Sequence, residues 1–253
     1  MNEIQIVNEA KRLVETAEGR NIKLRVMGAV AVRIHCSGFE ALHRHLGRKI
    51  SDLDFATRSK YRDSIFKLFR ELGYDVDEGM YYAASFVGQG HRAVLKKDDW
   101  AADIFFDKLQ MCHTIDFSKR LEIDSPTVSL GDLLLEKMQI VQLNEKDILD
   151  AIVIFREHDV GDSDAETINS LHISELLADD WGFYYTVTTN LSKVKAALPK
   201  YDPVQAEDRA DIEAKIDKLA SAIEERPKST KWKIRARVGP SAKWYRDVDE
   251  FLR

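Results

Sequence analysis

The hydrophobic periodicity of the chain changes once, near Leu130, and this change constrains the fold more than any other feature. Before Leu130, short apolar runs typical of strands are separated by amphipathic stretches with helical spacing. After it, apolar residues recur at helical spacing as far as residue 225. We therefore predict an α/β (α+β) protein, in which a mixed sheet with helices over residues 1–128 is followed by a mainly helical part over 129–253.

Individual elements follow from the same pattern. In the N-terminal part we expect strands at 22–28, 53–57, 100–107 and 120–130, a hairpin from "YYAASFVG" to "HRAVLKK", and helices at 3–18, 29–37 and 59–73. In the C-terminal part we expect helices at 130–143, 145–158, 167–179, 182–198 and 204–225. Residues 229–253 have no clear period, and a partly strand-like conformation is left open there.

The composition is that of a globular protein without a membrane span. Hydrophobic residues make up 44% and charged residues 32% of the chain, which excludes a disordered protein. No apolar run approaches the roughly 20 residues that a transmembrane helix needs, and the charged N-terminus does not resemble a secretory signal. The two cysteines, Cys36 and Cys112, make no disulfide framework. We expect a cytoplasmic protein with no membrane partner.

Two aspartates interrupt the apolar run "KISDLDFAT" at residues 49–57. Because side chains alternate along a strand, Asp52 and Asp54 are expected on one face while Leu53 and Phe55 enter the core. Two carboxylates so close repel each other unless a cation or water lies between them. Carboxylate oxygens on a strand suit Mg²⁺ or Mn²⁺. The alternative is that the pair ends an exposed edge strand.

A third carboxylate, Asp103, lies in the apolar run "WAADIFFD". A charge within such a run needs a partner. Three acidic groups from two strands could hold two Mg²⁺ ions around a nucleoside triphosphate. The alternative is an ion pair between Asp103 and a surface lysine.

Gly28 directly follows one expected strand and directly precedes an expected helix. A backbone without Cβ, followed by the free N–H groups of a helix N-terminus, can bind phosphate. The signal is weak by itself, since many strand-to-helix turns contain a glycine.

Three segments, "MGAVAVRIHC", "GRKISDLDF" and "AADIFF", together resemble the nucleotidyltransferase fold of the polymerase-β-like superfamily. That superfamily has a Gly-Gly or Gly-Ser turn before a helix, then Asp-x-Asp on the next strand and a third acid on a later strand. The segment "SLGDLLLEKMQIVQLNEKDILDAIVIF" also resembles the helical part of bacterial nucleotidyltransferases of the abortive-infection toxin type. The resemblance covers residues 22–158.

The resemblance implies roles for residues of the N-terminal part. The metal-binding pair would be Asp52 and Asp54, and the acid that activates the acceptor hydroxyl would be Asp103. The triphosphate turn would be formed by Gly28 and Ala29, with further cofactor contacts from the residues just before the aspartate pair, Arg48 and Ser51.

This sequence departs from the family pattern at two positions. Ala29 stands where the family has glycine or serine in the turn. Ile50 stands two residues before Asp52, where the family usually has serine or threonine, with Ser51 adjacent. The departures favour the alternative of a nucleotide- or RNA-binding regulatory protein with weak or no turnover.

A lysine lies within the apolar stripe of the helix expected from Leu130. Lys137 falls in the middle of this stripe, whereas Glu136 and Gln139 are expected to point away. An ammonium there needs an anionic partner or a cavity, or it reaches water along its stem. The resemblance implies that Lys137 faces the active site. It also implies that Asp150, which matches an aspartate on the next helix of the resembling family, belongs to the same site. The alternative for Asp150 is an i,i+4 pair with Lys146.

The implied reaction transfers a nucleoside monophosphate from a nucleoside triphosphate to an acceptor hydroxyl, with Mg²⁺ or Mn²⁺ as cofactor. The acceptor could be a tRNA end, a protein side chain or a small molecule. By analogy with the toxins, an antitoxin partner is also implied. A metal-dependent phosphodiesterase on the same three acids is a further alternative.

Two more clusters are weaker signals. The segment "RIHCSGFEALHRHLGR" contains His35, Cys36, His43 and His45, but their spacing fits no familiar zinc site. Residues 228–246 contain seven lysines and arginines and no acid, with Trp232, Trp244 and Tyr245 among them. This basic, aromatic tail could bind RNA through phosphate contacts and stacking, or it could be a packed hairpin with both tryptophans in a small core.

Overall fold

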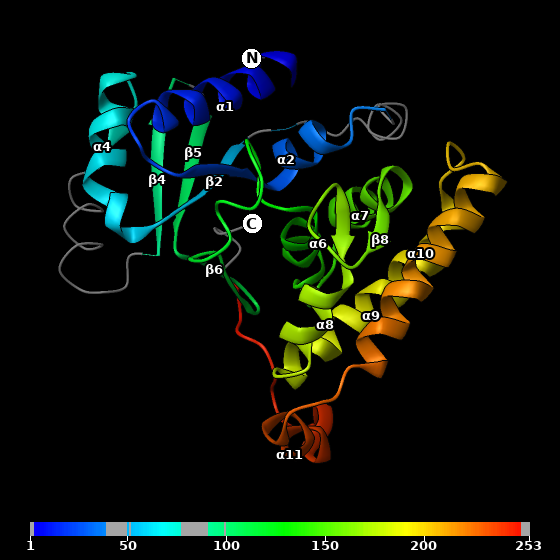
Figure 1. Ribbon diagram of the computed structural model, residues 1–253. Helices are drawn as coiled ribbons and strands as arrows, with labels where there is room; N and C mark the ends of the chain where they lie inside the picture. The colour runs from blue at the N-terminus through cyan, green and yellow to red at the C-terminus, as the bar shows by residue number, and fades with distance from the viewer. Residues whose placement is uncertain (1–2, 39–49, 51, 77–90, 99, 249–253) are drawn as a thin grey trace. The chain divides into compact units, whose positions relative to one another are not determined.

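The computed structural model describes residues 3–38, 50, 52–76, 91–98 and 100–248 (Figure 1). It is a mixed α/β protein with a helical C-terminal part, as the sequence predicts. The chain divides into two compact units, which are described separately. The first unit contains Met1–Ile34, Lys49–Gln110 and Thr114–Ser129, and the second contains His35–Arg48, Met111–His113 and Leu130–Arg253.

The first unit is built on a five-stranded mixed sheet with the strand order β1-β2-β5-β4-β3. Strands β2 and β5 are parallel, and the other neighbours are antiparallel. The predicted first strand of the hairpin, "YYAASFVG", lies outside the described residues, whereas "HRAVLKK" forms β4. In sheet order the strands are β1 (Leu24–Met27), β2 (Asp52–Thr57), β5 (Trp100–Phe106), β4 (Arg92–Lys97) and β3 (Asp75–Val76).

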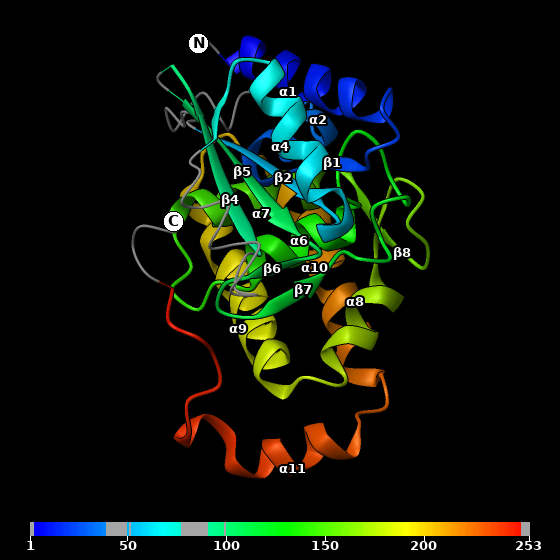
Figure 2. The same ribbon diagram turned by 90° about the vertical axis from the view of Figure 1, so that its left-hand side faces the viewer.

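Two helices, α1 (Glu3–Glu18) and α4 (Arg62–Glu71), cover one face of this sheet (Figures 1 and 2). The apolar stripe of α4 packs on β2 and β5, because Phe69 meets the ring of Phe55 and Phe66 meets that of Phe106. A salt bridge of 2.6 Å between Arg20 and Glu71 connects the end of α1 to α4. Both helices match their predicted spans closely, as expected for long periodic segments. A short 3₁₀ helix, Ser59–Tyr61, precedes α4.

The prediction of a strand over residues 120–130 is wrong. The segment is a series of turns that pairs with the sheet through an isolated bridge between Val26 and Thr127. The N–H of Val26 donates to the carbonyl of Pro126 at 2.9 Å, and the N–H of Val128 donates to Val26 at 3.0 Å. Pro126 has no N–H, so it cannot continue a ladder. The unit also contains α2 (Gly28–His35) except for its last residue, and a small hairpin of β6 (Lys108–Gln110) and β7 (Thr114–Asp116).

The second unit is helical, with one two-stranded parallel ribbon. Its helices pack around a core that includes Phe155, Phe183 and Leu219. None of the helices in the described ranges is long and apolar enough to cross a membrane. The elements are α6 (Leu130–Met138), α7 (Glu145–Glu157), β8 (Asp159–Gly161), β9 (Thr167–Asn169), α8 (Ser170–Leu177), α9 (Trp181–Ala197), a 3₁₀ turn (Leu198–Lys200), α10 (Ala206–Glu225), α11 (Thr230–Val238) and a last 3₁₀ turn (Gly239–Ser241).

Two helix boundaries differ from the prediction for identifiable reasons. Helix α6 ends at Met138, because the side-chain amide of Asn190 donates to the carbonyls of Met138 and Ile140 at 2.9 and 2.8 Å. Helix α8 begins only at Ser170, because Asn169 accepts a hydrogen bond from the N–H of His172 and caps it. Helix α7 is capped by Asn144, whose side chain accepts a hydrogen bond from the N–H of Asp147 at 2.9 Å.

The basic tail forms helix α11 and an extended segment, so the prediction of a packed hairpin is wrong. Ser229 caps the helix by accepting a hydrogen bond from the N–H of Trp232 at 3.1 Å. Helix α11 contains no buried residue, and it contacts α9 through Trp232 and Arg235. The indole N–H of Trp244 donates to Thr186 of α9 at 3.1 Å. Both tryptophans therefore contact other residues of the chain.

Candidate functional site: three aspartates beside a glycine corner

The parallel pairing of β2 and β5 brings the three predicted acids together. In the register of this pair, Asp54 lies opposite Asp103 and Asp52 lies opposite Ala101. Paired residues of adjacent strands point to the same face, and residues two apart along a strand do so as well. All three aspartates therefore lie on the face opposite Phe55, whose ring packs against α4.

The alternative in which Asp52 and Asp54 end an exposed edge strand is wrong, because β2 lies between β1 and β5. Asp52 is exposed at the start of the strand, whereas Asp54 is half-buried. The pair therefore lies at the start of an interior strand of the sheet.

Asp103 pairs with an arginine of the next strand rather than with a surface lysine. Its Oδ2 accepts a hydrogen bond from Nη2 of Arg92 on β4 at 2.5 Å. Burial raises the pKa of Asp103 above the usual range for aspartate. The positive charge of Arg92 opposes this rise in pKa, and the negative charge of Asp52 adds to it. Its other oxygen, Oδ1, is buried and has no hydrogen-bond partner among the described residues.

Gly28 forms a corner against Asp54. It follows the last residue of β1, Met27, which lies opposite Asp54 in the antiparallel pair of β1 and β2. The φ angle of Gly28 is +65°, a conformation that costs residues with a Cβ about 1–2 kcal/mol. A Cβ at this position would also lie 2.3 Å from Oδ2 of Asp54. A residue with a Cβ at this position would therefore force the carboxylate of Asp54 to move.

The helix predicted after the glycine is confirmed as α2, which begins at Gly28 itself. Ala29, in its first turn, is half-exposed, and its backbone N–H belongs to the helix N-terminus. Ile50 is half-buried. Arg48 and Ser51 lie outside the described residues, so their predicted contacts stay predictions.

The three aspartates have the chemistry of a divalent-cation site, although their side chains do not yet converge. No group of three or more His, Cys, Asp and Glu side chains in the described ranges is arranged to hold a metal ion. The backbones of β2 and β5 nevertheless already place the acids on one face. The buried Oδ1 of Asp103, which has no hydrogen-bond partner in the described part of the chain, and the corner at Gly28 also fit a bound cation and its anionic ligand.

Lys137 and Asp150, both in the second unit, form a buried ion pair. Nζ of Lys137 lies 3.3 Å from Oδ2 of Asp150, and the side chain of Asp150 is fully buried. The structure favours neither of the simpler alternatives, because Lys137 is buried and Asp150 pairs with Lys137 rather than with Lys146. The prediction that Gln139 points away from the apolar stripe is also wrong, since Gln139 is buried.

The histidine and cysteine cluster is only partly described. The ring of His35 makes an edge-to-face contact with that of His158, and Nε2 of His158 lies 3.3 Å from the carbonyl of His35. Burial and the nearby His35 lower the pKa of His158. His43 and His45 lie outside the described residues, so the weak prediction of a zinc site stays untested.

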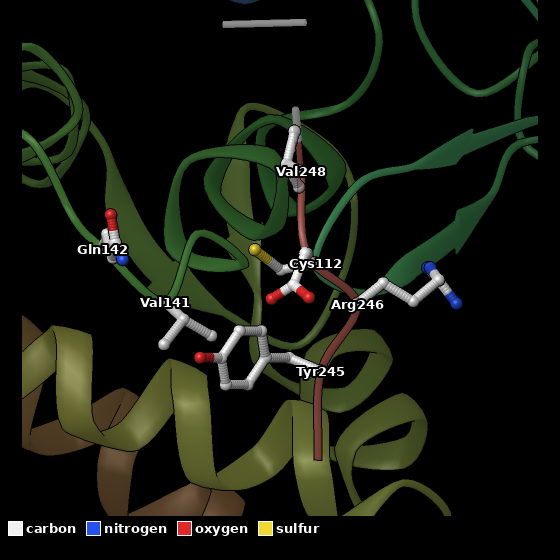
Figure 3. Close-up of a pocket in the computed structure, with 7 residues that line it drawn as sticks. Cys112, Val141, Gln142, Tyr245, Arg246 and Val248 are labelled. Atoms are coloured by element: carbon white, nitrogen blue, oxygen red, sulfur yellow. The ribbon is translucent and has the colours of Figure 1, made fainter. Parts of the chain in front are cut away.

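Two features of the structure were not predicted from the sequence. The sequence predicts Arg92 only as part of a hairpin strand. Its proximity to Asp103 follows from the pairing of β4 with β5. A cavity of about 220 Å³ in the second unit was not predicted at all (Figure 3). It is lined by Cys112, Val141, Gln142 and residues 245–248, and the side chain of Arg246 points away from it. This volume is below the roughly 300–1,000 Å³ of typical ligand sites.

Comparison with known proteins gives a distant likeness among solved structures. No protein-family model and no curated protein matches the chain. Among solved structures, the chain is similar to the antibiotic-resistance factor ANT(2'')-Ia, with 13% sequence identity and a TM-score of 0.36 over 88% of this chain and 97% of that chain. At this level of similarity the likeness carries no inference about the site or the reaction.

Proposed function

We propose that the protein is a divalent-cation-dependent nucleotidyltransferase. It would transfer a nucleoside monophosphate from a nucleoside triphosphate to an acceptor hydroxyl. The observation that carries the proposal is the register of β2 and β5, which places Asp54 beside Asp103 and Asp52 on the same face. Carboxylates on one face of two interior strands repel one another, and a divalent cation bound between them would relieve this repulsion.

In this proposal Asp52, Asp54 and Asp103 would together hold Mg²⁺ or Mn²⁺. The cations would neutralise charge on the triphosphate and stabilise the attacking and leaving oxygens. The carboxylate of Asp103 would accept the proton of the acceptor hydroxyl, and the burial that raises the pKa of this carboxyl makes it a stronger base. A bond forms between the acceptor oxygen and the α-phosphorus. The bond from the α-phosphorus to the bridging oxygen breaks, and pyrophosphate leaves.

The triphosphate would be held at the corner formed by Gly28. Helix α2 starts there, so the N–H groups of its first turn have no partners within the helix. These donors and the positive end of the helix dipole favour an anion. Ala29 supplies a backbone N–H but no hydroxyl, so the backbone would provide the contacts that serine provides in part of the resembling family.

Further roles in the proposal rest on the resemblance alone. Lys137 would neutralise phosphate charge, and Asp150, Arg48 and Ser51 would contact the nucleotide. A tRNA end, a protein side chain and a small molecule stay open as acceptors, and a toxin role with an antitoxin partner would follow only from the same resemblance.

The test is a transfer assay with α-labelled ATP, CTP, GTP and UTP, with Mg²⁺ or Mn²⁺, and with bulk tRNA, protein extract and aminoglycosides as acceptor pools. Label transfer and pyrophosphate release are expected, and Asp54→Asn should abolish both. The matched control is Asp75→Asn, which removes an exposed carboxylate from β3 of the same sheet.

Two other outcomes of these assays would establish a different function. Triphosphate binding that survives Asp54→Asn, without pyrophosphate release on any acceptor, would establish the regulatory nucleotide-binding protein instead. Metal-dependent hydrolysis of a phosphodiester without a triphosphate donor would establish the phosphodiesterase.

A further inference from the structure

The two carboxylate oxygens of Asp103 have different surroundings. Oδ2 is occupied by the charge-assisted hydrogen bond from Nη2 of Arg92. Oδ1 is buried and lacks a hydrogen-bond partner among the described residues. Because a buried polar atom without a partner carries an uncompensated desolvation penalty, a cation or a hydroxyl proton at Oδ1 would stabilise the site. One oxygen is therefore held by protein, and the other is free for a ligand.

The strand register explains how Arg92 reaches this carboxylate. In the antiparallel pair of β4 and β5, Arg92 lies opposite Phe105 and Val94 lies opposite Asp103. Arg92 is thus a diagonal neighbour of Asp103 on the same face of the sheet. Its guanidinium carbon lies 5.7 Å from the centre of the Phe105 ring, within the range of a cation–π contact. Two adjacent strands and an aromatic ring position Arg92 without any bound ion.

We propose that Arg92 is a positioning residue of the cation site, which fixes the carboxylate of Asp103 through Oδ2 so that Oδ1 faces the divalent cation. This inference rests on the proposed function, because it gives Arg92 a task only if the three aspartates bind a cation. Arg92 touches neither the cation nor the substrate in this account. It acts on them through the orientation of Asp103.

Two possible effects of Arg92 on cation affinity have opposite signs. The positive charge of the guanidinium repels a nearby cation, so if charge alone mattered, its removal would tighten cation binding. Its hydrogen bond fixes the carboxylate, so if orientation matters more, its removal weakens cation binding. Loss of such a supporting partner typically costs about 10–100-fold in metal affinity or activity. The sign of the change in affinity therefore distinguishes positioning from competition.

The experiment is a Mn²⁺ titration of the full chain, in which electron paramagnetic resonance measures free Mn²⁺. We expect Arg92→Met to weaken Mn²⁺ binding at least about tenfold. Arg92→Lys should also weaken it, though less, because lysine keeps the charge but lacks the planar fork of donors. The matched control is Lys96→Met, which removes an exposed cation from the same strand and the same face, opposite Ala101. It should bind Mn²⁺ at least as tightly as the wild type.

The outcomes separate this inference from the proposed function. If wild-type protein binds no Mn²⁺, or if Asp54→Asn binds it equally well, the cation site and the proposed function both fail. If Mn²⁺ binding depends on Asp54 but is unchanged or tighter in Arg92→Met and Arg92→Lys, only the role of Arg92 is overturned. Circular dichroism checks that each variant is folded. If Arg92→Met is unfolded, the Mn²⁺ affinity of the conservative variant Arg92→Lys decides the test.

Discussion

Replacing Gly28 by alanine tests the corner between β1 and the aspartates. Two effects are expected from the structure. Alanine at a φ of +65° costs about 1–2 kcal/mol of folding free energy. In addition, its Cβ would lie 2.3 Å from Oδ2 of Asp54, so that carboxylate must move. Forcing such a contact typically costs a further 1–3 kcal/mol or so. We therefore expect a total loss of about 2–5 kcal/mol, together with at least tenfold weaker Mn²⁺ binding.

Gly73 provides a matched control within the same unit. Its φ is +83°, but a Cβ there would meet nothing closer than the side chain of Lys97 at 3.8 Å. Gly73→Ala should therefore cost only the conformational strain, about 1–2 kcal/mol, and should leave Mn²⁺ affinity unchanged. Urea denaturation midpoints and Mn²⁺ titrations of both variants provide the comparison. Equal effects of the two substitutions on stability and on Mn²⁺ affinity would refute the argument that Gly28 makes room for Asp54.

Three further predictions concern the second unit. Lys137→Met should destabilise the protein by about 3–5 kcal/mol, because the fully buried Asp150 loses its cation; the double variant with Asp150→Leu should recover most of this in urea denaturation, and a loss below about 1 kcal/mol would contradict the prediction. Burial lowers the pKa of His113 to about 4, below its unfolded value near 6.5. The unfolded chain therefore binds more protons between these pH values, so stability falls by about 2 kcal/mol from pH 7 to pH 5; His113→Gln should remove this part of the fall, and an unchanged pH slope would speak against it. If the tail binds RNA, the affinity for bulk tRNA should fall with added salt, and replacing Lys233 and Arg237 with glutamine should reduce the salt slope by about two; an affinity that is insensitive to salt would count against phosphate contacts.

The main layout of the protein was predictable from sequence because it depends on periodicity. Helices α1, α4, α7, α9 and α10 carry long apolar stripes, and the structure confirms them near their predicted ends. The common face of Asp52 and Asp54 follows from alternation along one strand. That Asp103 lies beside Asp54 depends on the pairing of two strands far apart in the chain, which the resemblance implied and the register of β2 and β5 now shows.

The remaining features depend on contacts that a local pattern does not contain. Helix α6 ends where Asn190, from another helix, binds its carbonyls. Lys137 and Asp150 each looked ambiguous in isolation, because their partner is on a neighbouring helix rather than one turn away. In the sequence, nothing distinguishes Arg92 from other cations of a strand, because its proximity to Asp103 depends on the pairing of β4 with β5. Only the folded chain brings these residues together.

The most direct test of the central claim is a crystal structure with Mn²⁺ and a non-hydrolysable nucleoside triphosphate, recorded at a wavelength where manganese scatters anomalously. The account predicts anomalous peaks between Asp52, Asp54 and Asp103, with the triphosphate at the corner formed by Gly28. Manganese bound elsewhere while these three carboxylates stay unliganded would contradict it.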